Sequence, residues 1–222
     1  TDTDHINIKD GLEFVLVGKT DKDGKPSGDK LLSDAENGGS VHVNTGTLTL
    51  GSNGVKDKTG GTLAEVVLDE QGNLVIKNGD FTVERIESDG TLHVTGGGSL
   101  TSNDVTLDKG DSKIDEGGVL VVEDGESNGN LHIKGDGALT NEGTLIAGGK
   151  DSHVDTLVDG DLVNKGTGLY DDMTITNGGH YHDTSTGKDQ GDKIDVAEGG
   201  KWTNDGQSSW GQIDINGQFE NN

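Results

Sequence analysis

The feature that most constrains this chain is a repeated phrase: a short apolar strand, a glycine turn and another short apolar strand. Residues 91–102 (TLHVTGGGSLTS) match residues 130–141 (NLHIKGDGALTN) at an offset of 39. Residues 174–183 (TITNGGHYHD) match residues 195–204 (DVAEGGKWTN) at an offset of 21. A period near 20 residues with two or three strands per repeat is typical of a solenoid, in which each coil buries its apolar face only by stacking on its neighbours.

Composition alone would favour disorder, but the placement of the apolar residues favours a fold. Only 27% of the 222 residues are apolar and the formal net charge is −24, which leaves little apolar surface to offset chain entropy. The apolar residues nevertheless alternate with polar ones, in pairs such as Leu92/Val94 and Ile194/Val196. Alternation predicts strands with one buried face. No stretch has sustained helical spacing, and no apolar run is long enough to span a membrane.

The repeats predict an all-β solenoid of about 11 coils of roughly 20 residues each, in a single domain. We expect residues 1–37 to form an N-terminal coil or cap, with a polar loop at residues 18–30 that leaves the stack. Residues 38–222 are expected to form the regular coils. Absence of cysteine excludes a disulfide framework.

Glycine and asparagine recur at positions that indicate corners of the coils. Tight corners need positive φ, and the predicted corner pairs are Gly-Gly at 38–39, 117–118, 178–179 and 199–200. Asparagine side chains at equivalent sites of successive coils can stack amide on amide, and the candidates are Asn141, Asn164, Asn177 and Asn204. Asparagine is also common in turns for local reasons, so both interpretations stay open.

The repeats resemble those of a known family. Glycine turns followed by Leu-Thr, as in residues 96–101 (GGGSLT) and 135–140 (GDGALT), lie among short Val/Leu/Ile strands in an acidic chain without cysteine. Over about residues 38–222 this resembles the passenger domain of AIDA-type self-associating autotransporter adhesins. The resemblance implies a right-handed parallel β-helix that type V secretion exports across the outer membrane to the surface of a Gram-negative bacterium. It also implies adhesion, cell–cell aggregation, biofilm formation and virulence, and we expect a passenger fragment of a longer protein.

Two groups of residues have side chains suited to metal binding. Asp21, Asp23 and Asp29 surround a turn glycine, although the spacing of an EF-hand loop is not met. His180 and His182 are two residues apart on a predicted strand and share a face, where both could bind one ion. An acidic turn and surface histidines are the simpler interpretations, and the sequence supplies no third ligand for the histidine pair. We expect no cofactor beyond weak binding of divalent cations such as calcium by the 41 carboxylates.

The sequence favours an adhesive role over catalysis. Paired carboxylates suited to glycoside hydrolysis can occur anywhere on an acidic solenoid, whereas aromatic residues make up only 3% of the chain and Arg85 is its single arginine. We therefore expect no enzymatic activity, with a polysaccharide-processing enzyme as an alternative. The excess of acids excludes nucleic acid as a partner and disfavours anionic membranes.

The expected partner is a second copy of the protein on a neighbouring cell, or a host surface ligand without self-association. A rigid rod can present rows of threonine, asparagine, aspartate and serine, whose weak contacts add along its length. Two copies at −24 repel each other unless charges segregate between faces or ions screen them. The histidines of the triplets around His42, His93 and His132 are expected on the solvent face, as strand residues without a special role.

Overall fold

The computed structural model describes residues 5–29, 31–32, 39–52, 59–123, 129–148 and 153–222. These residues form strands and turns and contain no helix, and hence no helix long and apolar enough to cross a membrane. The strands are β1 (His5–Ile8), β2 (Leu12–Leu16), β3 (Ser40–Leu50), β4 (Gly60–Ile76), β5 (Gly79–Ser88), β6 (Thr91–Val94), β7 (Gly98–Ser102), β8 (Asp104–Ile114), β9 (Val119–Val122), β10 (Gly129–Asn141), β11 (Thr144–Ala147), β12 (Val154–Val158), β13 (Asp161–Asn164), β14 (Thr167–Ile175), β15 (His180–Asp183), β16 (Lys188–Val196), β17 (Lys201–Asn204), β18 (Gln207–Ile215) and β19 (Gln218–Asn221).

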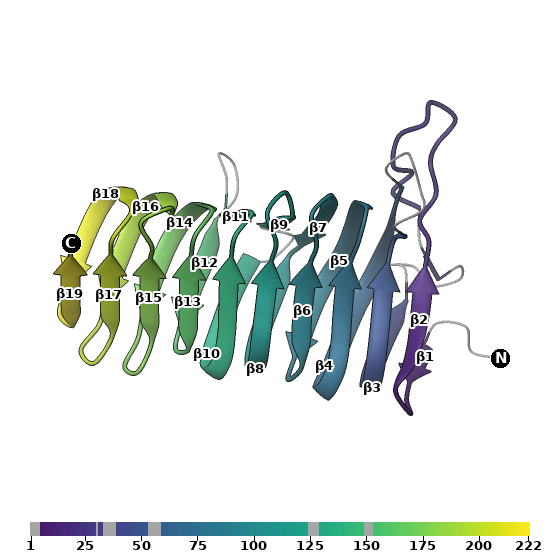
Figure 1. The fold of residues 1–222 in the computed structure, drawn as a ribbon, viewed down its shortest axis with the longest axis horizontal. Coiled ribbons are helices and arrows are strands. Elements are labelled where there is room, and N and C mark those ends of the chain that lie inside the picture. The colour runs from purple at the N-terminus through teal and green to yellow at the C-terminus, as the bar shows by residue number, and fades with distance from the viewer. Residues whose placement is uncertain (1–4, 30, 33–38, 53–58, 124–128, 149–152) are drawn as a thin grey trace.

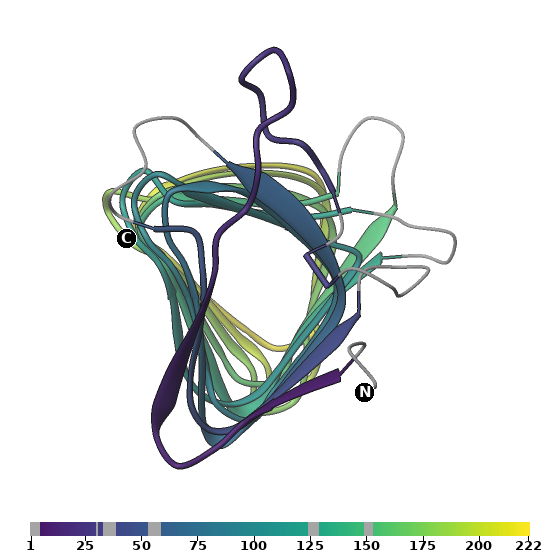
Figure 2. The ribbon, with the colours of Figure 1, turned by 90° about the vertical axis from the view of Figure 1, so that its right-hand side faces the viewer.

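The described strands form one continuous 19-stranded sheet that wraps around a core and presents three parallel faces (Figures 1 and 2). Face A contains residues 5–8, 40–43, 65–68, 85–88, 104–107, 130–133, 155–158, 172–175, 193–196 and 212–215. Face B contains residues 12–16, 46–50, 73–76, 91–94, 111–114, 138–141, 161–164, 180–183, 201–204 and 218–221. Face C contains residues 60–63, 80–83, 99–102, 119–122, 144–147, 167–170, 188–191 and 207–210.

The chain winds in the right-handed sense. In Figure 1 the near strands run upward while the chain advances from its N-terminal end on the right to its C-terminal end on the left. Seen along the axis, the turns superimpose as a rounded triangle (Figure 2). The predicted all-β parallel solenoid is therefore confirmed.

The expected count of about 11 coils is too high. Among the described residues, eight turns have all three faces, and a two-sided turn stands at each end. The spacing between stacked residues on face A varies from 17 residues (Val158 to Ile175) to 35 (Ile8 to Val43). Dividing the length by a constant period overlooks this variation, because residues in the longer connections add no strand to the stack.

Sequence repeats identified the stacking partners at only some offsets. The 21-residue offset is confirmed, because Thr174 pairs with Asp195. The 39-residue offset does not correspond to stacking, because Leu92 lies on face B whereas Leu131 lies on face A. The strand–glycine–strand phrase occurs at different corners of the triangle, so matching it does not identify the face.

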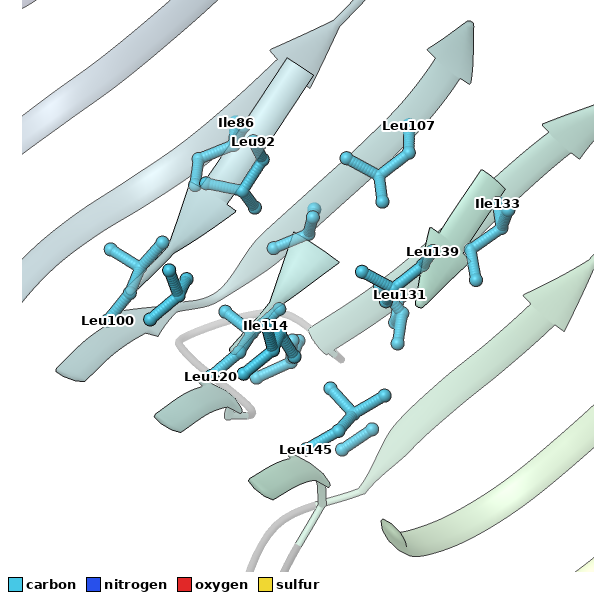
Figure 3. Packing of buried hydrophobic residues seen from close by; sticks show 14 of the residues in the cluster. Ile86, Leu92, Leu100, Leu107, Ile114, Leu120, Leu131, Ile133, Leu139 and Leu145 are labelled. Carbon is cyan, nitrogen blue, oxygen red and sulfur yellow. The ribbon is translucent and has the colours of Figure 1, made fainter. Parts of the chain in front are cut away.

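Inward side chains of all three faces form one continuous core. On face C, Leu100, Leu120 and Leu145 stack in successive turns and are 0% exposed (Figure 3). Burial of each such side chain contributes about 1.5–3 kcal/mol. The core thus compensates for a low apolar content by burying a large share of the aliphatic residues.

The predicted corner glycines have the expected backbone. Positive φ occurs at Gly39, Gly117, Gly178 and Gly199, with values of 82°, 78°, 93° and 83°. The partner of the first pair, residue 38, lies outside the described residues. Side chains with a Cβ rarely adopt this conformation, so glycine at these positions allows the chain to turn between faces.

Amide stacking is confirmed for most of the predicted asparagines and is wrong for one. Asn141 donates from Nδ2 to Oδ1 of Asn164 at 2.7 Å, and Asn204 donates to Oδ1 of Asn221 at 2.9 Å. Asn177 instead lies in the turn after β14, outside this row. Its Asn-Gly-Gly context places it at a corner, where asparagine has a local role.

The N-terminal part joins the stack through β1 and β2, which form the first two-sided turn. Lys19 then pairs with Gly60 and Thr20 with Pro26 as antiparallel bridges. This segment projects from the N-terminal end of the solenoid (Figures 1 and 2), where the polar loop was predicted. Residues 1–4, 30 and 33–37 of the expected cap lie outside the described residues.

Candidate interaction surface

The outward side chains of face C form an uncharged surface in the middle of the rod. From Thr82 in β5 to Leu169 in β14, these outward positions carry only hydroxyl and aliphatic side chains. This neutral face consists of Thr82, Ser99, Thr101, Val119, Val121, Thr144, Ile146, Thr167 and Leu169. The nearest charged residues at equivalent outward positions are Asp80 toward one end and Lys188 toward the other.

The other two faces are charged along the same length. Outward positions of face A carry Glu65, Arg85, Glu87, Asp104, Asp155, Asp172, Lys193, Asp195 and Asp214. Those of face B carry Asp111, Lys113 and Asp161 beside the neutral face and Lys201 and Glu220 beyond it, together with the histidines His93, His180 and His182. Charge is therefore segregated between faces in a chain whose net charge is −24.

The residues of the neutral face suit a flat, half-exposed sheet. Threonine, valine and isoleucine have high strand propensity, and equivalent residues stack on the next turn, as Val121 does on Ile146. Leu169 continues this row and is 37% exposed. Between Ile146, Leu169 and Gln190 the surface is hollowed, with a volume of about 330 Å³. Gly191, which also lines this hollow, makes room for the ring of Trp210, because a Cβ there would meet that ring.

Face A carries a larger and more polar hollow. Its volume is about 550 Å³, and its lining includes Arg85, Asp104, Asn130, His132 and Asp155 from successive turns. The guanidinium of Arg85 is paired with Glu87, and it also lies 3.9 Å from Glu65. The hollow thus combines one guanidinium with the carboxylates of Glu87, Asp104, Asp155 and Asp172, and its described lining contains no phenylalanine, tyrosine or tryptophan.

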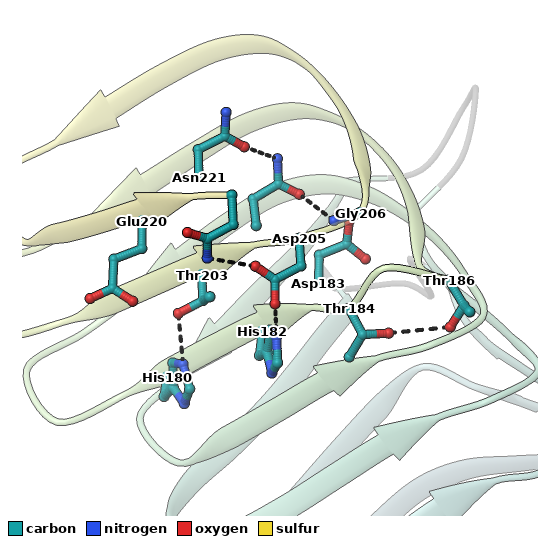
Figure 4. A network of polar contacts seen from close by, with 12 residues as sticks. His180, His182, Asp183, Thr184, Thr186, Thr203, Asp205, Gly206, Glu220 and Asn221 are labelled. Carbon is teal, nitrogen blue, oxygen red and sulfur yellow. Dashed lines mark hydrogen bonds and ion pairs between the residues drawn. The ribbon is translucent and has the colours of Figure 1, made fainter.

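Four outward histidines share one arrangement that the sequence analysis missed. Each lies inside a strand segment, and its Nε2 contacts an aspartate of the next turn. That aspartate comes directly after the strand segment that stacks on the segment of the histidine. The pairs are His42–Asp69 at 2.9 Å, His93–Asp115 at 2.7 Å, His132–Asp159 at 2.6 Å and His182–Asp205 at 2.9 Å (the last in Figure 4). The hydrogen bond from His42 lowers the pKa of Asp69. These histidines are on the surface as predicted, but they link consecutive turns.

The predicted pair of metal ligands, His180 and His182, has separate partners. The two rings stack with centroids 6.0 Å apart. The Nδ1 of His180 lies 3.6 Å from Asp161 and its Nε2 lies 3.3 Å from the hydroxyl of Thr203, whereas His182 contacts Asp205 (Figure 4). Tyr181 between them is fully buried, as their outward orientation requires.

The acidic loop candidates are held by local hydrogen bonds. Asp21 Oδ1 accepts from the backbone N–H groups of Asp23 and Lys25, at 2.8 and 3.0 Å. The N–H of Asp29 donates to Ser27 Oγ at 3.1 Å. Among the described residues, Asp21, Asp23 and Asp29 do not belong to a group of three metal-binding side chains whose ligand atoms lie close together. Metal binding by them remains a prediction.

A polar cluster lies inside the last turns. Asp183 occupies the row of stacked asparagines between Asn164 and Asn204, and Asp189 enters the same space from face C. Asn164 Nδ2 donates to both carboxyl groups, and the hydroxyl of Tyr181 donates to Asp189. Burial, together with the neighbouring charge of Asp183, raises the pKa of Asp189 to about 7. Because Asp183 is 0% exposed and Asp189 only 6% exposed, we assign this cluster a structural role.

Comparison with known proteins adds one distant structural match. No protein-family model matches the chain, and no curated protein matches it in sequence. Among solved structures, it is similar to the crystal structure of a TibC-catalysed, hyper-glycosylated fragment of TibA. The identity is 15% and the TM-score 0.31, over 99% of this chain and 96% of that one. A match this distant carries no argument, so the fold is assigned from the strand pairing above.

The neutral face was missed by the sequence analysis because it occupies every third strand. Its signal is nonetheless present: the face-C segments of the middle turns, as in residues 119–122 (VLVV) and 144–147 (TLIA), contain no charged residue. Finding it requires the assignment of each strand to a face, which the variable length of the turns conceals.

Proposed function

We propose that this protein is a non-enzymatic adhesive module of a bacterial cell surface that associates with further copies of itself through the neutral face. The observation that carries the proposal is the uncharged surface of face C in a chain with a net charge of −24. The resemblance of the repeats to autotransporter passenger domains supports export and surface display. Aggregation and biofilm formation would follow where many copies are presented on facing cells.

Charge segregation makes face C the surface on which two copies can meet. Like charges that face each other across an interface cost free energy, and the outward rows of faces A and B would place carboxylates opposite carboxylates. Two neutral faces avoid this cost and bury Val119, Val121, Ile146 and Leu169 against one another. Their threonine hydroxyls can hydrogen-bond across the interface or through water.

The size of the neutral face predicts a weak single contact. Five turns at about 4.8 Å each, and strands of about 13 Å, give a footprint on the order of 300 Å². A stable interface usually buries about 800 Å² on each partner. Adhesion through this face therefore depends on many copies that engage together, since multivalency multiplies weak contacts.

A bead aggregation assay with matched variants tests the proposal. The full chain is attached to beads through its C-terminus, in buffer with a chelator so that divalent cations do not bridge carboxylates. Ile146→Asp places a charge in the neutral face, and we expect it to abolish aggregation. Leu157→Asp is the control, because Leu157 is also an outward, half-buried aliphatic residue, but on face A.

Aggregation of the wild type and of Leu157→Asp, with loss in Ile146→Asp, would support the proposal. Absence of wild-type aggregation, or equal effects of the two substitutions, would contradict self-association through face C. Far-UV circular dichroism establishes that both variants keep their strand content.

A second candidate is adhesion to a host ligand without self-association. The observation that favours it is the hollow on face A, which offers carboxylates, an imidazole and an amide over several turns. Such a lining suits a ligand that carries amino or hydroxyl groups. Under this alternative, labelled and unlabelled cells would not co-aggregate, and Leu157→Asp would reduce binding to host surfaces whereas Ile146→Asp would not.

A further inference from the structure

A histidine and two aspartates converge on face A, at the edge of its large hollow. His153 immediately precedes β12, Asp155 lies within it, and Asp172 is the residue directly beside Asp155 on the next turn. One ligand atom from each of the three side chains lies within 4.8 Å of the others. Among the described residues, this is the group in which three metal-binding side chains come together.

The distances within this group suit a first-row divalent ion. Zinc binds imidazole nitrogen and carboxylate oxygen at about 2.0–2.2 Å, so tetrahedral ligands lie roughly 3.4 Å from one another. His153 Nε2 already lies 3.4 Å from Asp155 Oδ1. Only Asp172 needs to rotate toward this pair, and its side chain is partly exposed and therefore has room to do so.

The backbone that carries the three ligands is held from both sides. Val154, between His153 and Asp155, has a side chain that is 0% exposed, and its N–H donates to Asp171 Oδ2 at 3.1 Å. Met173, next to Asp172, is likewise buried. Because the inward neighbours are fixed in the core, the ligand side chains are directed outward on the same side.

The electrostatics favour a cation at this point. Asp155 and Asp172 are like charges directly side by side on adjacent strands, an arrangement that is unfavourable without a neutralising group. The next residue in the row is Lys193, whose ammonium lies near Asp195 and Asp214 at 3.8 and 3.6 Å. A divalent ion would neutralise both carboxylates, and the imidazole adds selectivity for a transition metal over calcium.

We propose that His153, Asp155 and Asp172 form a binding site for one divalent transition-metal ion, with Zn²⁺ as the best fit. Three protein ligands leave at least one coordination position for water, which faces solvent and the hollow of face A. The site lies on a different face from the neutral surface, so it goes beyond the proposed self-association and does not depend on it.

Calorimetric titration of the tag-free full chain with ZnCl₂ at pH 7 tests this site. We expect one ion per chain for the wild type. His153→Ala and Asp172→Asn should each weaken binding about tenfold or more. Asp104→Asn is the matched control, because Asp104 lies in the same outward row and hollow but outside the three-ligand group.

Thermal unfolding gives a second readout, because an ion that binds only the folded state raises Tm. Zn²⁺ should raise Tm of the wild type and of Asp104→Asn but not of His153→Ala. Absence of binding, binding of several equivalent ions, or equal weakening by Asp104→Asn would overturn the proposal in favour of general attraction to an acidic surface. All three substitutions are at outward positions, and His153→Gln serves as a replacement if His153→Ala does not fold.

Discussion

Asp183 and Asp189 share the same hydrogen-bond donor inside the last turns of the solenoid. The side-chain amide of Asn164 donates to Asp183 Oδ1 at 3.1 Å and to Asp189 Oδ1 at 2.6 Å. Ser208 Oγ lies 3.3 Å from each carboxyl group on the opposite side. Two acidic groups in one buried space cannot both ionise without cost, so their shared proton makes stability depend on pH.

We predict that Asp183→Asn stabilises the protein above neutral pH. Asp183 occupies a row whose neighbouring members are Asn164 and Asn204, so asparagine fits the local geometry and removes one charge. The free energy of unfolding at pH 8 should rise by roughly 1–3 kcal/mol, the usual cost of a poorly satisfied buried polar group. Urea unfolding measures this, with Asp111→Asn on the exposed surface as the control.

The pH dependence has a defined sign. The pKa of Asp189 is raised by burial to about 7, so the folded state holds its proton more tightly than the unfolded chain does. Its contribution to stability is fully present below the unfolded pKa of about 4 and is lost as the pH rises through about 7. Asp183→Asn should flatten this loss between pH 5 and pH 8. An unchanged pH profile in the variant would show that the two carboxyl groups do not share a proton.

The histidine–aspartate contacts between turns should contribute in the opposite direction. Burial acts to raise the pKa of Asp159, but hydrogen bonds from Thr176 and His132 outweigh it and lower the pKa. Such a contribution is present above the unfolded pKa of about 4 and is lost as the pH falls through the lowered value. His132→Gln should therefore cost about 0.2–1 kcal/mol at pH 6 and less at pH 3.

Urea unfolding at the two pH values measures the effect of His132→Gln. Thr106→Gln is a suitable control, because Thr106 stacks on His132 in the same outward row but on the side away from the turn that carries Asp159. Equal losses at pH 3 and pH 6 would mean that the contact with Asp159 does not contribute through its charge.

The sequence was sufficient to predict the solenoid but not the assignment of strands to faces. Alternating pairs such as Ile194/Val196 predict a strand with one buried side whatever its neighbours are, and Ile194 is indeed buried. The stacking partner of a residue depends on the length of each turn, which varies from 17 to 35 residues on face A. For this reason Leu92 and Leu131 were matched although they belong to different faces.

The candidate sites follow the same distinction. His180 and His182 were found because two residues on one strand share a side, a local property of the chain. Asp155 and Asp172 come together only because one turn is 17 residues long, and neither was singled out from the sequence. The histidine–aspartate pairs also join consecutive turns, but at separations of 22 to 27 residues, so a fixed spacing in the sequence does not identify them.

Self-association should strengthen as salt rises from very low levels. The neutral face removes direct contacts between like charges, but acids such as Glu142 and Asp192 remain at the corners beside it, and the net charge of −24 repels at long range. Raising ionic strength from about 0.01 M to 0.15 M shortens the screening length from about 30 Å to about 8 Å. Bead aggregation should therefore increase over this range. Clumping that is strongest in ion-free buffer would instead indicate attraction between opposite charges.

The division of each strand into inward and outward positions can be tested on two adjacent residues. Leu120 is 0% exposed within the core, whereas its neighbour Val121 belongs to the outward neutral face. Leu120→Ala leaves a cavity between stacked turns and should lower the free energy of unfolding by about 2–5 kcal/mol. Val121→Ala removes less buried surface and should cost under about 1 kcal/mol, the span of strand propensities. Urea unfolding of both variants measures the difference, and similar costs would contradict a core built from stacked face-C leucines.

Bead aggregation of the same two variants, at a temperature where both are folded, separates stability from adhesion. We expect Val121→Ala to weaken aggregation and Leu120→Ala to leave it unchanged, because only Val121 lies on the outward side of the strand.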